Sequence, residues 1–173
     1  SRGLGDVYKR QMYHVAAYSD KDYAAIDVLN NILTSDPSGY LYKSLVDTHK
    51  IASIWAYSPE VRDASFFYIG TEIPKEKNIE QTKNDIRAEL DKVATINYTD
   101  QDVQRAKASI VKNIENQKNN TINYAIGLTE IVGAGDYRLG FLYRDNIEKV
   151  TKEDVKRVAC LLYTSPSPRD RQK

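Results

Sequence analysis

Residues 51–73, IASIWAYSPEVRDASFFYIGTEI, contain the two clearest strand signals of the chain. Residues 51–58 and 64–73 are rich in β-branched and aromatic side chains, and a charged loop that begins with Pro59 separates them. This pattern predicts an antiparallel hairpin. Residues 12–19 are also rich in strand formers and nearly free of charge, so we expect them to form a third strand.

Helical signals surround these strands. Asp20 can cap a helix that starts at Lys21, and Thr99 with Asp102 resembles a capping box. Apolar side chains recur at helical spacing along each segment and so predict helices. The predicted helices cover residues 21–34, 40–49, 79–93, 100–114, 121–132 and 152–158. We therefore expect an α+β fold, with an antiparallel sheet and helices packed on one of its faces.

Composition excludes several classes of protein. The 173 residues include 25 Lys and Arg against 24 Asp and Glu, for a net charge of +1. This balance gives no electrostatic reason to expect a nucleic-acid partner. No apolar run approaches the roughly 20 residues that a bilayer requires, so we expect no membrane span. Cys160 is the only cysteine, so the chain has no internal disulfide framework.

The two ends differ from the middle. Residues 1–11 (SRGLGDVYKRQ) and 160–173 (CLLYTSPSPRDRQK) show neither helical nor strand periodicity. Both resemble translated sequencing-adaptor sequence, so we expect non-native tails flanking a domain of residues 12–159; two genuine flexible tails are the alternative. Each flank carries a net charge of +2, which leaves −3 for the domain. The abrupt ends also suggest a piece of a longer protein.

Catalytic and metal-binding motifs are not apparent. His14 and His49 are isolated in the sequence, and no cysteine lies within residues 12–159, so neither a helical histidine pair nor a cysteine site can hold zinc. Gly133 to Asp136 (GAGD) lacks the spacing of a phosphate loop and is better explained as a helix stop and a turn. We predict no catalytic, cofactor-binding or metal-binding residue. The acidic residues of one helical segment lie among lysines and indicate a solvated surface: Glu76, Glu80, Asp85, Glu89 and Asp91.

Three segments carry a family pattern. The first joins residues 13–15 (YHV) to residues 22–29 (DYAAIDVL), and the second is residues 38–46 (SGYLYKSLV). The third and longest, residues 135–155, contains GDYRL, YRD, IEKVT and DV in that order. Together they resemble the insulinase (pitrilysin) family of zinc metallopeptidases, in particular the second, metal-free domain of its zinc-bearing half. The resemblance spans residues 12–159.

This resemblance implies a role as well as a fold. Family members enclose an unfolded peptide between two halves, and an inverted His-x-x-Glu-His motif with a distal Glu holds zinc in the domain that precedes this one. We therefore expect no metal in this chain and zinc in the adjacent domain. The Arg-x6-Tyr pair that many members use corresponds to Val46 and Ser53, so that pair is missing. Tyr40 replaces the Arg that the family usually has in "GRLY".

The resemblance implies a structural, peptide-enclosing domain of a zinc-dependent endopeptidase. Its expected partners are other domains of the same protein or a sister subunit, and the peptide substrate of the parent. Two alternatives stay open: a non-catalytic scaffold or partner subunit of the same family, and an unrelated small-molecule binding module. We also expect an exposed apolar patch where sister domains dock. The compartment is open, because bacterial relatives occur in both periplasm and cytoplasm.

Overall fold

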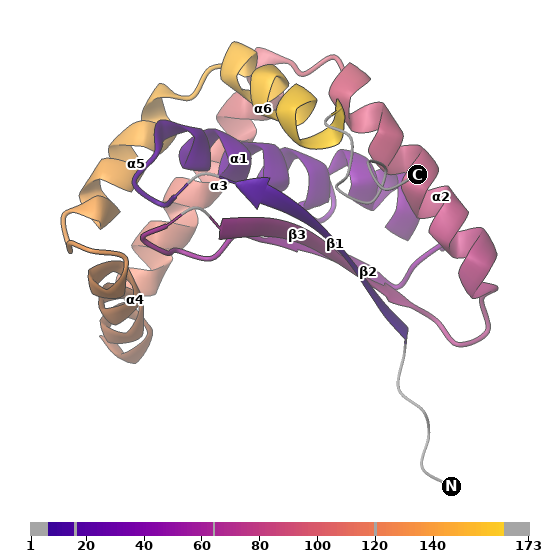
Figure 1. Ribbon diagram of the computed structural model, residues 1–173, viewed down its shortest axis with the longest axis horizontal. Coiled ribbons are helices and arrows are strands. Elements are labelled where there is room, and N and C mark those ends of the chain that lie inside the picture. Colours follow the sequence, from indigo (N-terminus) through magenta and orange to yellow (C-terminus); the bar gives the residue numbers. More distant parts are fainter. Residues whose placement is uncertain (1–6, 16, 64, 120, 165–173) are drawn as a thin grey trace, which may run out of the picture.

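A three-stranded antiparallel sheet forms one layer of the protein (Figure 1). The computed structural model describes residues 7–15, 17–63, 65–119 and 121–164. The strands are β1 (Val7–Val15), β2 (Ser53–Tyr57) and β3 (Ser65–Ile73), in the order β1-β3-β2. Both neighbours of β3 run antiparallel to it. The predicted hairpin and third strand are therefore confirmed.

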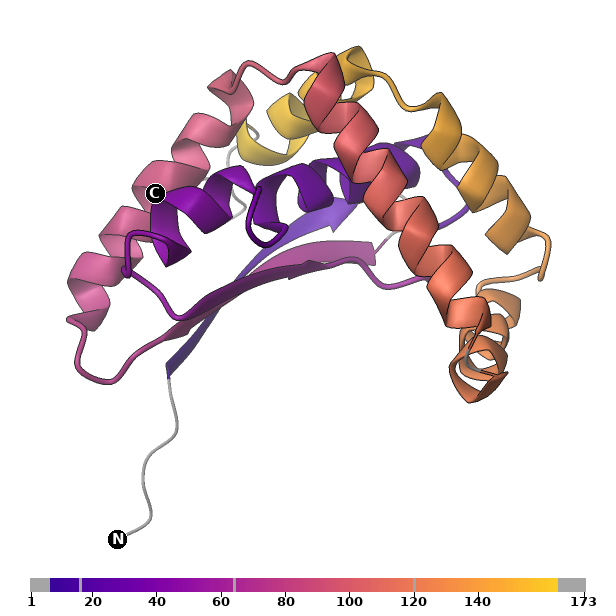
Figure 2. The same ribbon diagram turned by 180° about the vertical axis from the view of Figure 1, so that it is seen from behind.

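The helices all lie on one side of this sheet, as the α+β prediction requires, and Figure 2 shows the same arch of helices from behind. Helix α1 runs along the sheet, and α3, α5 and α6 pack around it. Helices α2 and α4 lie at the two ends of the arch. The helical elements are α1 (Lys21–Thr34), the π-helical turn η1 (Tyr42–Val46), α2 (Ile79–Lys92), the 3-10 turn η2 (Val93–Thr95), α3 (Asp100–Lys118), α4 (Thr121–Gly133), α5 (Leu139–Lys149) and α6 (Lys152–Thr164).

Alternation along β3 separates a covered face from an open face. Phe67, Ile69 and Ile73 are buried at 0%, 2% and 0% exposure and point into the core beneath α1. Phe66 directly precedes Phe67 and is 37% exposed, because side chains of a strand alternate between the two faces. The sheet therefore presents one face to the helices and leaves the other uncovered.

Two predicted caps have the expected geometry. The Asp20 side chain accepts a hydrogen bond from the backbone N–H of Asp22 at 2.9 Å, where α1 begins. Thr99 and Asp102 form a reciprocal capping box at the start of α3. The side chain of each accepts the backbone N–H of the other at 3.1 Å. These local hydrogen bonds determine where α1 and α3 begin, because each helix starts directly after its capping residue.

The structure corrects four of the secondary-structure predictions. Regular structure was not expected in either flank, but Val7–Gln11 belong to β1 and Cys160–Thr164 to α6. Residues 1–6 and 165–173 lie outside the described residues. The helix expected over residues 40–49 is a short π-helical turn. Helix α5 was not predicted at all. No helix within the described ranges is both long and apolar enough to cross a bilayer.

Candidate functional site

The two histidines do not form a metal site. His14 lies in β1 opposite Phe66, whereas His49 follows η1 with a left-handed backbone φ of 57°. Among the residues that the structure describes, no three His, Cys, Asp or Glu side chains come together as a metal-binding group. On α2, Glu80 pairs with Lys83 at 2.6 Å and Glu89 with Lys92 at 2.8 Å, which is the solvated surface that the sequence indicates.

The segment Gly135–Arg138 forms the turn between α4 and α5. Gly135 has a φ of 133°, a conformation that few other residues adopt. The Asp136 Oδ1 atom accepts the backbone N–H of Arg138 at 2.9 Å, and the Arg138 guanidinium lies 5.7 Å from the centre of the Tyr137 ring. The expected helix stop and turn are confirmed, and the segment has no phosphate-loop geometry.

The positions that depart from the family pattern have structural contacts. The Ser53 hydroxyl donates to the Glu72 carboxylate at 3.1 Å across the β2–β3 pair, and Val46 packs against the core. The Tyr40 hydroxyl donates to the Asp102 carboxylate at 3.1 Å. Tyr40 thus supports the capping box of α3, and none of these three positions offers a cation to a substrate.

Four aromatic side chains gather on the open face of the sheet, at the ends of β2 and β3. Tyr68 lies at the centre, with ring-centre distances of 5.3 Å to Trp55, 5.6 Å to Tyr57 and 5.7 Å to Phe66. The first two contacts are edge-to-face and the third is stacked, the geometries that aromatic pairs prefer. We call these four residues the aromatic sheet face.

Gly70 makes this arrangement possible. It is the partner of Trp55 in the β2–β3 register, and a Cβ atom built on Gly70 would lie 2.2 Å from the indole Cζ2 of Trp55. The ring therefore rests directly on the backbone of β3, which any other residue would prevent. The glycine allows the indole to lie flat on the sheet instead of extending into solvent.

A second cluster joins α1 to α5 through tyrosines and a carboxylate. The Tyr143 hydroxyl donates a hydrogen bond to the Asp27 carboxylate, and Tyr18 stacks on Tyr143 with ring centres 5.4 Å apart. Tyr23 packs edge-on to Tyr18 and donates to the Ser58 carbonyl at 2.8 Å. Burial raises the pKa of Asp27, although hydrogen bonds from Tyr143 and Asn30 favour its ionised form. The tyrosines thus hold a carboxylate at the junction of two helices.

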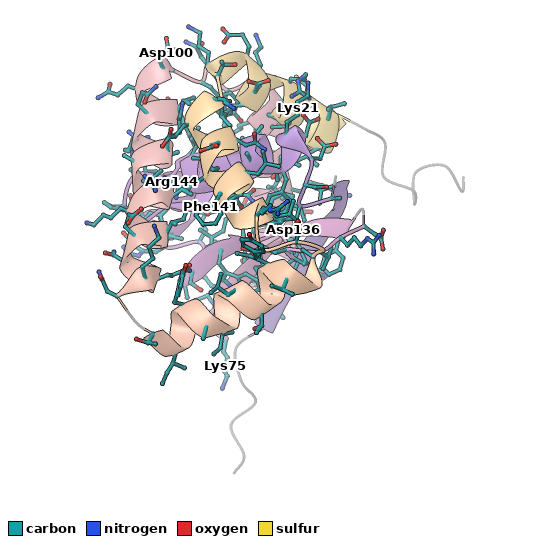
Figure 3. The ribbon with its side chains drawn as sticks, turned by 90° about the vertical axis from the view of Figure 1, so that its left-hand side faces the viewer. Lys21, Lys75, Asp100, Asp136, Phe141 and Arg144 are labelled. Carbon is teal, nitrogen blue, oxygen red and sulfur yellow. The ribbon has the colours of Figure 1, made fainter. Side chains whose placement is uncertain are left out.

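Glu60 lies beside this cluster, in the loop between β2 and β3. Burial, and then the nearby carboxylates of Asp27 and Glu130, raises the pKa of Glu60 to about 7. Glu60 and Glu130 both line a pocket of about 370 Å³ between α3, α4 and α5. Such a carboxyl group changes its charge near neutral pH, so it can respond to a cation or to pH. Figure 3 views this end of the molecule, with Phe141 and Arg144 labelled on α5.

Comparison with known families decides the identity of the domain. Residues 10–110 match the profile of the peptidase M16 inactive domain. The chain belongs to this family. The resemblance to the metal-free domain of insulinase-family zinc proteases is thereby confirmed, and so is the M16-type fold, which solved structures share with this chain.

Relatives of this M16 domain come from several organisms. The inactive peptidase domain of a protein assigned as a zinc protease from Bordetella parapertussis superposes with a TM-score of 0.81 at 23% identity, over 94% of this chain and 87% of that one. A protease structure from Helicobacter pylori gives a TM-score of 0.79 at 21% identity, over 94% and 40%. The zinc protease PqqE of Helicobacter pylori is 29% identical over 138 residues, 75% of this chain. The chain spans 31% of that relative's length.

Sequence reasoning missed the tertiary clusters of this M16 domain. Asp27 and Tyr143 stand in the family pattern, but nothing local shows that they meet across 116 positions. Glu60 looks like an ordinary loop acid until the fold brings Glu130 beside it. An indirect signal was present in α4. Its sequence is strongly apolar although polar segments flank it, which indicates that it packs against another surface.

Proposed function

We propose that this chain is a structural, peptide-enclosing domain of a zinc-dependent metalloendopeptidase, and that the zinc group lies in another domain of the parent protein. The observation that carries the proposal is the M16 inactive-domain match over residues 10–110. It is supported by the lack of a metal-binding group among the described side chains. The match covers only 31% of the zinc protease from Helicobacter pylori, so most of that protein's length lies outside the matched region.

The aromatic sheet face is the surface that would meet the peptide. Helices cover the opposite face of the sheet, so this face is free to line a chamber. Tyr57 is 50% exposed and Phe66 37% exposed, and both belong to a continuous set of ring contacts. Aromatic surfaces bind extended peptides of varied sequence, because a ring face packs against many kinds of side chain. This breadth suits an enclosure better than a specific pocket.

A reconstitution assay tests this proposal. The purified chain should hold no stoichiometric zinc and should not cleave a quenched fluorescent peptide of about a dozen residues. The zinc-bearing domain encoded in the same reading frame should cleave that peptide at least tenfold faster when this chain is added. Stoichiometric zinc in the chain alone, or cleavage by it alone, contradicts the proposal.

A matched pair of variants locates the peptide contact. Tyr57→Ser removes an exposed ring from the aromatic sheet face, and Leu161→Ser removes a similarly exposed side chain from α6, which is 55% exposed. The Tyr57 variant should raise the KM of the reconstituted enzyme severalfold, whereas the Leu161 variant should leave it unchanged. Equal effects of the two variants would remove the aromatic sheet face from the proposal.

The second candidate is a non-catalytic scaffold or partner subunit of the same family. It is favoured by the fold likeness to a chain in the complex III structure of Candida albicans, with a TM-score of 0.73 at 17% identity. The parent reading frame separates the two candidates. A zinc-motif helix upstream of the domain supports the protease, and a parent without that motif supports the scaffold.

A further inference from the structure

Helix α4 is held to the domain by little apolar burial. Ile131 is half-buried and packs against the tyrosine cluster, whereas Ile122, Ile126 and Val132 are large, apolar and exposed. A helix of 13 residues is marginal in water without tertiary contacts. Exposed apolar side chains continue onto the α4–α5 turn and α5 at Tyr137 and Phe141, which are 54% and 65% exposed. We call the five exposed residues the α4–α5 surface.

A pocket of about 370 Å³ opens within this surface. Tyr18 and Tyr143 line it from the direction of the tyrosine cluster, and Ile126, Tyr137 and Phe141 of the α4–α5 surface line it as well. This volume lies near the lower end of the roughly 300–1,000 Å³ that ligand pockets span, so it suits one long side chain rather than a folded segment. An apolar surface with a pocket of this size can receive a projecting side chain of a partner.

The charges in the pocket are asymmetric. Lys118 and Arg144 contribute to its lining, but both are paired with Glu115, at 3.1 Å each. Glu60 and Glu130 also line it, and in the part of the chain that the structure describes no cation forms an ion pair with either. Two carboxylates beside tyrosine rings offer ion pairing and cation–π attraction together.

We propose that this pocket receives an arginine or lysine side chain that projects from an apolar surface of an adjoining domain of the parent protein. The inference rests on the proposed function in one respect, namely that the chain is one domain of a longer protein. The carboxylates of Glu60 and Glu130 favour a cationic side chain, and the exposed α4–α5 surface favours an apolar surface around that side chain. A permanently docked domain would also cover the apolar side chains that α4 exposes in the isolated chain.

Glu60 should make the docking sensitive to pH. Its pKa of about 7 reflects burial and the carboxylates of Asp27 from α1 and Glu130 from α4. The hydroxyls of Tyr18 and Tyr143 face the same cluster and stay neutral in this range, because burial raises the pKa of both. Glu60 is therefore mostly neutral at pH 5.5 and mostly ionised at pH 8, so cation binding should strengthen as pH rises through 7.

Probe peptides test the pocket on the whole chain in solution. The capped tripeptide acetyl-Leu-Arg-Phe-amide is titrated at pH 8 and followed by amide chemical shifts in NMR, beside the same peptide with citrulline, which keeps the shape of arginine without its charge. The arginine peptide should shift amides of α4 and α5 with a Kd of about 1–10 mM, because a linked domain presents its side chain at millimolar effective concentration. The citrulline peptide should bind at least about tenfold more weakly.

Charge variants with a matched control assign the contact. Glu130→Gln and Glu60→Gln should each weaken the arginine peptide severalfold, whereas Glu89→Gln, which alters an acid on α2 far along the arch, should not. At pH 5.5 the affinity of the unmodified chain should also fall severalfold. Equal binding of both peptides, or no binding, overturns the proposal.

Other occupants give distinct results. A micromolar Kd would mean that the pocket captures free peptide, and it would overturn the assignment to a linked domain. Concentration-dependent dimerisation in sedimentation velocity that Glu130→Arg abolishes would assign the surface to a second copy and overturn it as well. If the probe peptides do not bind as expected, the results of the zinc and reconstitution assays still stand. If those assays fail while the arginine peptide still binds selectively, the proposed protease function is wrong but the cation pocket is retained.

Discussion

Removal of the Tyr143 hydroxyl should destabilise the domain in a pH-dependent way. This hydroxyl donates to the carboxylate of Asp27 and so ties α5 to α1. Tyr143→Phe keeps the ring and its stacking on Tyr18, and removes only the donor. A hydrogen bond to a charged group contributes about 1.5–3 kcal/mol to the free energy of unfolding, and one to a neutral group about 0.5–1.5 kcal/mol. The loss should therefore follow the charge of Asp27.

The sign of the pH dependence follows from linkage. Burial raises the pKa of Asp27 in the folded state above its unfolded value of about 3.9, so the native state keeps this proton longer. The stability from this group is complete below that unfolded pKa and is lost as pH rises through the folded pKa. Tyr143→Phe removes a donor that favours the ionised form and so raises the folded pKa further. The variant should lose about 1 kcal/mol while Asp27 is protonated and about 2–3 kcal/mol once the pH has risen through the folded pKa of Asp27.

Urea unfolding at several pH values, followed by circular dichroism and Trp55 fluorescence, measures this difference. Tyr98→Phe is the matched control, because the Tyr98 hydroxyl is buried and donates at 2.7 Å to a neutral carbonyl, that of Val93. Its cost should be about 1 kcal/mol at every pH. A Tyr143→Phe cost that stays flat with pH, or that equals the Tyr98→Phe cost throughout, would refute the coupling to Asp27.

Three further changes test the core, the open face and a helix cap. Phe67→Ala should cost about 3–5 kcal/mol in the free energy of unfolding, because the ring is fully buried, whereas Phe66→Ala on the open face should cost about 1 kcal/mol; the difference in urea midpoints checks both. Gly70→Ala should displace the Trp55 indole at a cost of about 1–3 kcal/mol and shift its emission to the red. Asp102→Asn should cost about 1–2 kcal/mol at pH 7 and less below pH 3, as seen in thermal unfolding. Although burial opposes ionisation of Asp102, hydrogen bonds from Thr99 and Arg105 hold its pKa below the usual range, so its stabilisation exists above about pH 3.9 and is lost on acidification.

The sequence predicted those features whose causes are local. Asp20 and the Thr99–Asp102 pair set helix starts through contacts within three residues, so the sequence alone is sufficient to locate them. The two hairpin strands were likewise located from the β-branched and aromatic composition of each segment. Helix α5 was missed because its apolar residues do not form one buried stripe. Phe141 and Leu142 are exposed, and Ile147 is the buried side chain that the helix contributes.

The clusters could not be predicted, because they form only when distant segments meet. Val7–Gln11 lack strand character on their own and become a strand through pairing with β3. Asp27 is the acid in an otherwise buried stretch of α1, and Tyr143 belongs to the helix that was missed. Neither position shows in sequence that a carboxylate and a phenol will meet there. Tertiary contacts of this kind lie beyond periodicity and capping rules, which describe one element at a time.

The two exposed surfaces do not arise from a lack of core. A domain of about 150 residues can bury roughly 68–70% of its unfolded surface, and this one builds a continuous core from its sheet, α1, α3 and α6. Burial of the aromatic sheet face or α4 is therefore not needed for folding. The first lies on the uncovered face of the sheet and the second at one end of the arch of helices. We propose separate contacts for the two surfaces, a peptide on the sheet and a domain on α4. Because burial and then the nearby Glu130 carboxylate raise the pKa of Tyr57, the two positions are coupled, and the effects of Tyr57→Ser and Glu130→Gln should not be fully additive in the parent protein.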